Sequence, residues 1–232
     1  MSPITIGVLA LQGGFIEHIN LVRAAAAQLH LDVTTLEVRT AEELARCDGL
    51  IIPGGESTTI SFVAAQSGLL EPLRDYVKTQ KRPVWGTCAG LILLSNEANA
   101  TKKNGQELIG GLGVRVHRNH FGRQIESFEA GMDLPFLGEG SSPFPGVFIR
   151  APVVEEILSA SASGSGSDVE VLAKLPGRVD RMKAGVSQAN TSNDAGDIIA
   201  VRQGNILGTS FHPELTNDAR IHAWWLKSIA RQ

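Results

Sequence analysis

Short apolar runs alternate with segments of helical periodicity along the first half of the chain. The run at 4–11 is nearly continuous, which is typical of a strand buried on both faces of a parallel sheet, and the segments at 32–38 and 48–52 predict the next two strands. After the first run, apolar residues recur every three or four positions, and this spacing predicts a helix with one buried face. The positions are Phe15, Ile19, Val22, Ala26 and Leu29. Strands that alternate with helices predict right-handed βαβ units and a sheet covered on both faces.

The same pattern predicts a short helix over 41–45 and a longer helical region over 58–79. Gly68 and Pro72 are expected to interrupt the longer region, because both residue types disfavour a helix interior. An apolar strand at 83–85 follows it.

The second half of the chain is richer in turns, most of all over 111–150. Several short runs there and beyond predict strands, some of them antiparallel. They are 113–116, 146–149, 169–175, 178–183, 198–203 and 205–209. A final helix is predicted over 216–230, and the Ser/Gly-rich stretch at 158–168 is interpreted as a surface loop. We therefore expect one three-layer α/β domain over 1–232, with a mostly parallel sheet flanked by helices and antiparallel strands in the C-terminal half.

Composition places the chain among ordinary globular proteins. Hydrophobic residues make up 43% of the 232 residues and charged residues 19%. The net charge of −3 offers no basic surface for nucleic acid, and no apolar run approaches the ~20 residues of a membrane span. The two cysteines, Cys47 and Cys88, are far apart in sequence, and the N-terminus lacks the pattern of a secretory signal. These features favour a cytoplasmic enzyme.

The candidate nucleophile is Cys88, in the sequence Gly-Thr-Cys-Ala-Gly at 86–90. This segment lies between an apolar strand and a helical run at 91–94, the arrangement of a nucleophile elbow. Glycines on either side remove side chains where strand and helix would collide. The helix N-terminus favours thiolate, yet a free cysteine with a pKa of about 8.5 is mostly protonated at neutral pH. The thiol therefore needs a base.

His212 and Glu214 supply a candidate base and its orienting acid. They follow the apolar run at 205–209, and in an extended chain residues two apart point the same way. Pro213 favours an extended conformation for the residue before it. The three residue types together form a Cys–His–Glu triad. The alternative is that His212 is a loop histidine and Glu214 caps the final helix.

The segment 53–59, Pro-Gly-Gly-Glu-Ser-Thr-Thr, follows a strand and opens a helix. Its glycines allow a close backbone approach to a ligand, so the N–H of Gly55 and that of Ala89 are candidates for an oxyanion hole. A plain glycine turn with a Ser/Thr cap satisfies the same sequence. No lysine follows the glycines, which argues against a phosphate-binding loop.

Candidate cations for a substrate carboxylate are Arg118 and Arg150, both from the turn-rich middle. His120 lacks a paired acid and is interpreted as a surface or interface residue. Cys47 lacks glycine neighbours and a following helix, so it is interpreted as a structural thiol.

Six segments together resemble the class I glutamine amidotransferases, and among them the glutaminase subunits of pyridoxal 5′-phosphate synthase. The resemblance extends from Ile4 to the final helix. The segments are Leu-Ala-Leu-Gln-Gly at 9–13, Pro-Gly-Gly-Glu-Ser-Thr-Thr at 53–59, Gly-Thr-Cys-Ala-Gly-Leu-Ile-Leu-Leu at 86–94, Arg-Asn-His-Phe-Gly-Arg-Gln at 118–124, Phe-Ile-Arg-Ala-Pro at 148–152 and Ser-Phe-His-Pro-Glu-Leu at 210–215.

The resemblance implies a flavodoxin-like fold and hydrolysis of L-glutamine to L-glutamate and ammonia, which a synthase subunit would receive as partner. It assigns Cys88 as nucleophile, His212 as base and acid, and Glu214 as its orienter, with no cofactor. Gln12 is expected near the oxyanion hole and the synthase interface. The glutamine-binding residues it implies are Gly54, Gly55, Glu56, Arg118, Ile149 and Arg150.

The chain departs from the family pattern at His120, where serine is frequent, and in the longer loop at 158–168. Three other readings remain open at the level of sequence: a glutaminase for a different synthase, a cysteine hydrolase on a related scaffold, and a non-catalytic interaction subunit. A metal site is disfavoured because one cysteine and a His-x-Glu pair do not form a closed ligand set.

Overall fold

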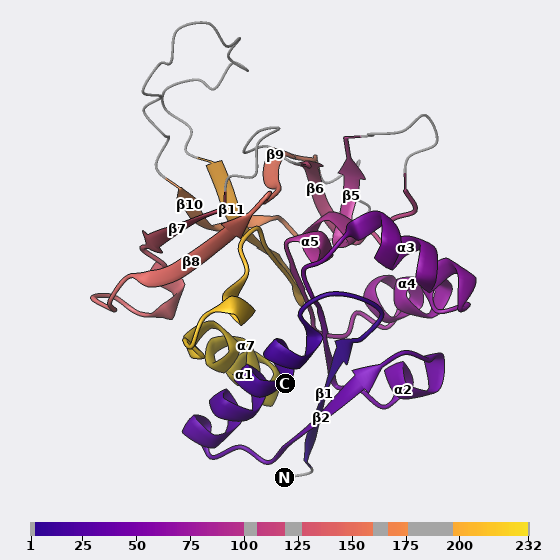
Figure 1. Cartoon of the computed structure of the whole chain (residues 1–232), viewed down its shortest axis with the longest axis horizontal. Coiled ribbons are helices and arrows are strands. Elements are labelled where there is room, and N and C mark those ends of the chain that lie inside the picture. Colours follow the sequence, from indigo (N-terminus) through magenta and orange to yellow (C-terminus); the bar gives the residue numbers. More distant parts are fainter. Residues whose placement is uncertain (1–2, 100–105, 119–126, 160–166, 176–196, 232) are drawn as a thin grey trace, which may run out of the picture.

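The computed structural model describes residues 3–99, 106–118, 127–159, 167–175 and 197–231. Within these residues the main sheet has ten strands, nine of them in the order β2-β1-β3-β4-β12-β11-β9-β6-β5, with β10 paired to β11 (Figure 1). Their bounds are β1 Ile4–Leu9, β2 Val33–Val38, β3 Gly49–Ile52, β4 Val84–Thr87, β5 Ser95–Ala98, β6 Leu112–His117, β9 Val153–Ile157, β10 Glu170–Leu175, β11 Asp197–Gln203 and β12 Ile206–Thr209.

One half of this sheet is parallel. β2, β1, β3, β4 and β12 pair in the same direction, and so do β5 and β6 at the other edge, whereas β12–β11, β11–β9, β9–β6 and β10–β11 are antiparallel. The expected α/β architecture, with antiparallel strands in the C-terminal half, is confirmed. A parallel sheet brings the carboxyl ends of its strands to one edge, so the residues after β1, β3, β4 and β12 meet there.

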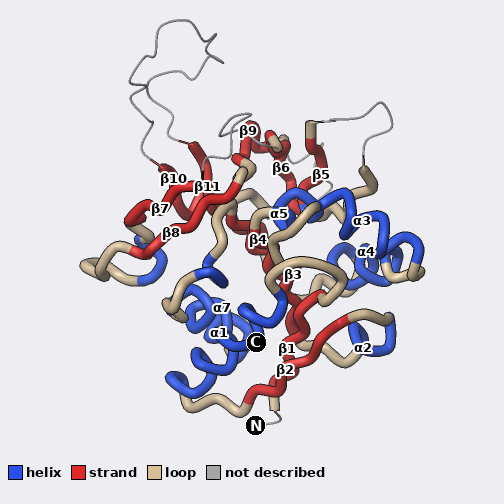
Figure 2. Tube along the Cα trace, viewed as in Figure 1, coloured by secondary structure: helices blue, strands red, loops and turns tan. Residues whose placement is uncertain are grey.

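Helices cover both faces of the sheet, as Figure 2 shows. α1 (Phe15–Leu29) and α7 (Arg220–Ala230) pack together on one face. Val8, Val22 and Trp225 belong to the apolar cluster on that face. The opposite face carries α2 (Ala41–Ala45), α3 (Ser57–Gln66), α4 (Leu70–Lys78) and α5 (Ala89–Leu94). No helix in the described part of the chain has the length and apolarity needed to cross a membrane.

The helical region expected over 58–79 is two helices. The break lies at Gly68, which has a φ of +72° that glycine adopts without strain. The expected interruption at Pro72 is wrong. Pro72 lies in the first turn of α4, where its missing N–H has no intrahelical partner to lose.

Several boundaries in the second half also differ from expectation. The final helix begins at Arg220, because Pro213–Leu215 forms a separate 3-10 turn, η2. β5 and β9 were not anticipated, nor was β7 (Ser127–Met132), which forms a hairpin with β8 (Phe144–Ile149). A second 3-10 turn, η1 (Pro135–Leu137), lies between β7 and β8. The strand expected at 178–183, His120 and residues 160–166 of the Ser/Gly-rich loop lie outside the described residues.

Candidate active site

Cys88 occupies a sharp turn between β4 and α5. Its φ of 47° and ψ of −99° lie outside the favoured regions for a residue with a side chain. Its backbone N–H donates a 2.8 Å hydrogen bond to the carbonyl of Thr209, which ties the turn to β12. The side chain is buried. Such strain is typical of residues whose position is over-determined by the surrounding structure.

Steric contacts explain both glycines of the elbow. A Cβ on Gly86 would lie 2.4 Å from the carbonyl carbon of Gly90. A Cβ on Gly90 would lie 2.1 Å from the carbonyl oxygen of Ile52, in the neighbouring strand β3. Any side chain at either position therefore forces α5 away from the sheet and moves the thiol.

His212 and Glu214 lie at the end of β12. The Nδ1 atom of His212 is 2.7 Å from Oε1 of Glu214, and both side chains are buried. The His212 backbone N–H donates a 2.8 Å hydrogen bond to the carbonyl of Val147, which fixes the turn against β8.

The local geometry of this pair differs from the sequence argument. The alternation of an extended strand does not bring the two side chains together, because η2 begins at Pro213 and folds Glu214 back onto the imidazole. Glu214 also does not cap α7, which begins six residues later at Arg220.

The electrostatic surroundings of His212 favour imidazolium. Burial by itself would lower the pKa of His212, but its interactions with Cys88 and Glu214 outweigh this and raise the pKa to about 10. Burial would raise the pKa of Glu214, yet His18 and His212 hold it well below its usual range. Nε2 of His212 has no hydrogen-bond partner among the described residues. A base held by a carboxylate on one nitrogen, with the other left for a thiol proton, has the geometry of a triad.

The loop after β3 packs directly on the imidazole. A Cβ on Gly54 would lie 2.3 Å from Cε1 and 2.6 Å from Nδ1 of His212. The loop after β1 covers this segment in turn. A Cβ on Gly13, whose φ is +100°, would lie 1.8 Å from the carbonyl oxygen of Gly54, and the backbone N–H of Glu56 donates a 2.7 Å hydrogen bond to Oε1 of Gln12.

Glu56 and Arg118 lie together at the start of α3. Partial burial would raise the pKa of Glu56, but hydrogen bonds from Thr58 and Thr59 lower it to about 2, so this carboxylate caps the helix in its charged form. Nη2 of Arg118 donates a 3.1 Å hydrogen bond to Ser57 Oγ and lies 4.0 Å from Oε1 of Glu56. Burial and the nearby carboxylate restrict this guanidinium to a fixed position.

Residues 8–231 match the SNO glutamine amidotransferase family. The chain belongs to this family. It is 46% identical over 231 residues to a probable pyridoxal 5′-phosphate synthase subunit PDX2 of Arabidopsis thaliana, covering 96% of this chain and 85% of that protein. It is 47% identical over 229 residues to the pyridoxal 5′-phosphate synthase subunit PdxT of Streptomyces avermitilis, covering 99% and 96%. A crystal structure of a glutamine amidotransferase superposes with a TM-score of 0.71 at 39% identity, covering 97% of this chain and 98% of that one.

The remaining predicted residues of this SNO-family chain lie at the edge of the site or away from it. Ile149 and Arg150 are exposed at the end of β8, just beyond Val147, and Arg150 has a φ of 44°. Cys47 is buried, donates its thiol hydrogen to the carbonyl of Glu43 at 3.3 Å, and has a pKa that burial raises to about 11. A protonated, buried thiol is unreactive.

Sequence reasoning missed two histidines that the fold brings to the triad. His18 in α1 and His222 in α7 are both fully buried, and Nε2 of His18 lies 3.3 Å from Oε2 of Glu214. The available signal was their place in two amphipathic helices, next to the apolar residues Ile19 and Ile221. A polar residue on a buried helix face requires a partner, but the sequence does not show which one.

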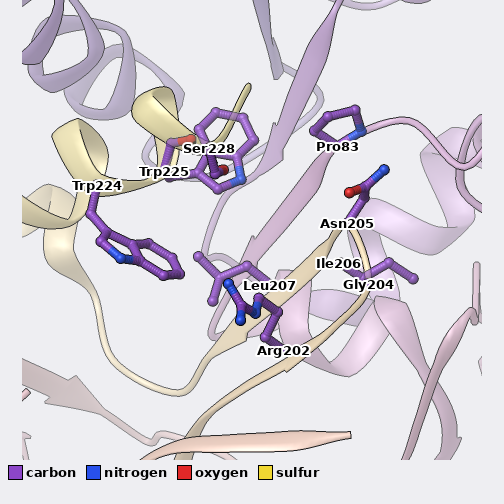
Figure 3. Close-up of a pocket in the computed structure, with 9 residues that line it drawn as sticks. All are labelled: Pro83, Arg202, Gly204, Asn205, Ile206, Leu207, Trp224, Trp225 and Ser228. Carbon is purple, nitrogen blue, oxygen red and sulfur yellow. Dashed lines mark hydrogen bonds between the residues drawn. The ribbon is translucent and has the colours of Figure 1, made fainter. Parts of the chain in front are cut away.

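A cavity of about 160 Å³ lies elsewhere in the molecule (Figure 3). Its lining includes Pro83, just before β4, and Asn205, just before β12. These are the amino ends of the strands, whereas Cys88 and His212 follow their carboxyl ends. The cavity is therefore separate from the candidate active site. The other lining residues are Arg202, Gly204, Ile206, Leu207, Trp224, Trp225 and Ser228.

Proposed function

We propose that this chain is the glutaminase subunit of a pyridoxal 5′-phosphate synthase, which hydrolyses L-glutamine to L-glutamate and ammonia and supplies the ammonia to a synthase subunit. One observation carries the proposal: a buried imidazole, 2.7 Å from the Glu214 carboxylate, shares the carboxyl edge of the sheet with a cysteine in a strained elbow. Membership of the SNO family and relatives named as subunits of this synthase support the substrate and the partner.

In the proposed reaction the Cys88 thiolate attacks the side-chain amide carbon of glutamine. His212 takes the thiol proton and gives it to the departing nitrogen, so ammonia leaves and a γ-glutamyl thioester remains. His212 then takes a proton from water, which attacks the thioester and releases glutamate and the thiol. Glu214 stays ionised throughout and holds the imidazole in one orientation.

Each addition step places a negative charge on the former carbonyl oxygen. We assign its stabilisation to the backbone N–H groups of Gly55 and Ala89, and a donor of this kind typically contributes about 3 kcal/mol. Gln12 lies beside this position, because a Cβ on Gly55 would be 2.4 Å from its Oε1.

The glutamine itself requires groups that recognise an α-carboxylate and an α-amine. Arg118, held by Ser57, and the ionised Glu56 supply opposite charges close together, which suits both ends of an amino acid. Gly54, Gly55, Ile149 and Arg150 complete the proposed glutamine-binding set. The net charge of −3 supports a small-molecule substrate in place of nucleic acid, and we place the reaction in the cytoplasm.

The test is ammonia release from L-glutamine by the purified chain, alone and with a pyridoxal 5′-phosphate synthase subunit added. We expect release that rises with the partner and is lost in Cys88→Ala. A folded wild-type chain that releases no ammonia under either condition would overturn the proposal. Release that the synthase does not change would retain the glutaminase and overturn the partner.

A further inference from the structure

His18 and His222 form a chain of buried contacts that ends on the triad carboxylate. Nδ1 of His18 lies 2.9 Å from Nε2 of His222, and Nε2 of His18 lies 3.3 Å from Oε2 of Glu214 and 3.2 Å from Oγ1 of Thr87. The side chains of His18 and Glu214 are 0% and 1% exposed. The carboxylate is therefore hydrogen-bonded at Oε1 by His212, while Oε2, which has no hydrogen bond among the described residues, faces Nε2 of His18 at ion-pair distance.

Proton counting fixes the direction of these contacts. A bare lone pair on Nε2 of His18 would face the Glu214 carboxylate, which can only accept, so Nε2 carries a hydrogen, which it shares with the Thr87 hydroxyl. In a neutral His18, Nδ1 then accepts, and Nε2 of His222 donates. This leaves Nδ1 of His222 without a hydrogen, and that atom is buried with no hydrogen-bond partner among the described residues. The opposite arrangement, with a cationic His18, would leave a buried N–H of His222 unpaired, and orphaned buried N–H groups are rarer in proteins than under-satisfied acceptors.

The surroundings reinforce the neutral arrangement. Burial lowers the pKa of His222 well below its ordinary value, which keeps this imidazole neutral. Trp85 packs edge-on against both rings, with centroid distances of 5.6 Å to His18 and 4.8 Å to His222. Besides Glu214, the groups that face His18 are Thr87 from β4, His222 from α7 and the Trp85 ring, while Glu17 from α1 lies near the Glu214 carboxylate across Gly14.

We propose that His18 and His222 are positioning residues of the glutaminase reaction, acting through Glu214 on His212. His222 sets the tautomer of His18, His18 places an N–H group 3.3 Å from the second oxygen of Glu214, and the carboxylate holds the imidazole toward Cys88. Neither histidine touches the reacting atoms. The expected effect on glutamine turnover rests on the proposed function. The expected effect on the Cys88–His212 pair does not.

The experiment measures alkylation of Cys88 by iodoacetamide at pH 6 and pH 8, followed by peptide mass spectrometry. This readout needs neither glutamine nor a synthase subunit. His18→Leu removes the polar N–H group that faces Oε2 of Glu214, so the carboxylate protonates more readily and supports the imidazolium less. For His18→Leu we expect the pH 6 to pH 8 rate ratio to fall about threefold or more, and kcat for glutamine to fall about tenfold with KM little changed.

His18→Gln retains an N–H donor and is expected to recover most of the wild-type rate ratio. Tyr76→Phe is the matched control, because it also removes a buried hydrogen bond, from Tyr76 Oη to the carbonyl of Cys47, on the opposite face of the sheet. It is expected to lower the melting temperature and leave the rate ratio unchanged. If His18→Leu does not fold, His222→Leu and His222→Gln carry the same comparison.

A wild-type rate ratio in folded His18→Leu or His222→Leu would overturn the proposal, since a purely structural role changes stability and not the reactivity of Cys88. The proposal is supported if His18→Leu or His222→Leu lowers the rate ratio and the corresponding His18→Gln or His222→Gln variant restores it. Failure of the proposed function would appear differently, as wild-type protein with normal alkylation and no ammonia release.

Discussion

The imidazole of His212 occupies the space that a side chain on Gly54 would need. A Cβ at Gly54 would approach Cε1 of His212 to 2.3 Å, well below any tolerated contact between carbon atoms. Gly54 therefore brings the loop after β3 against one side of the imidazole, while Glu214 holds Nδ1. A change in the loop at Gly54 therefore changes the position of the His212 imidazole.

Gly54→Ala is expected to displace His212 and lower kcat for glutamine hydrolysis by about 100-fold, because small displacements of a catalytic group have effects of this size. The measurement is steady-state ammonia release, with circular dichroism to verify folding. Gly131→Ala is the control, since its Cβ would meet only the Pro143 side chain, at 3.3 Å, and its activity should match wild type. Full activity in Gly54→Ala would show that the imidazole does not need its observed position.

Cys88 stores backbone strain that a glycine would release. At a φ of 47° and a ψ of −99°, a side chain costs about 1–3 kcal/mol. Cys88→Gly and Cys88→Ala both lack the thiol and should both be inactive, yet the glycine variant should unfold at a temperature several degrees higher. About 1 kcal/mol corresponds to roughly 2–4 °C in a chain of this size. Equal melting temperatures would indicate that the elbow relaxes in solution.

Arg115 lies on β6 and Arg118 directly follows this strand, so the two arginines provide a matched comparison. Arg118 is mostly buried beside Ser57 and Glu56, whereas Arg115 is exposed and paired with Glu97. Arg118→Ala is expected to raise KM for glutamine at least tenfold, because a charge-assisted contact to the substrate carboxylate contributes about 1.5–3 kcal/mol. Arg115→Ala should leave KM within about twofold of wild type, as exposed ion pairs contribute little. Similar KM values in both variants would remove Arg118 from the glutamine-binding set.

The raised pKa of His212 predicts how stability changes with pH. In unfolded protein a histidine titrates near 6.5, and in the folded chain the pKa of His212 is about 10. Its stabilising contribution is therefore complete below about pH 6.5 and is lost as the pH rises toward 10. Urea unfolding should show the free energy of wild type, relative to His212→Gln, falling between pH 6.5 and 9.5. A difference that stays constant or grows with pH would contradict the raised pKa.

The parallel half of the fold could be predicted because its signals are local. Continuous apolar runs and three-to-four residue spacing report strands and helices without reference to the rest of the chain. β5 (Ser-Asn-Glu-Ala) and β9 (Val-Val-Glu-Glu-Ile) were missed because they are short and contain polar or charged residues in place of a continuous apolar run. β7 was missed because its pattern is weak and its pairing with β8 depends on the structure of the hairpin. The beginning of the final helix was misplaced for a related reason, since the turn at Pro213 is held by the contact between His212 and Val147.

The candidate site divides in the same way. Two motifs could be recognised from the sequence alone. A sharp strand-to-helix turn requires small residues on both sides of the nucleophile, which explains Gly86 and Gly90, and the His-x-Glu pair places an acid close to a base. Their catalytic roles remain predictions. The contacts of Gly54 with His212 and of His18 with Glu214 depend on the tertiary structure alone. Burial makes these contacts specific, and burial is decided only when distant segments pack and exclude water.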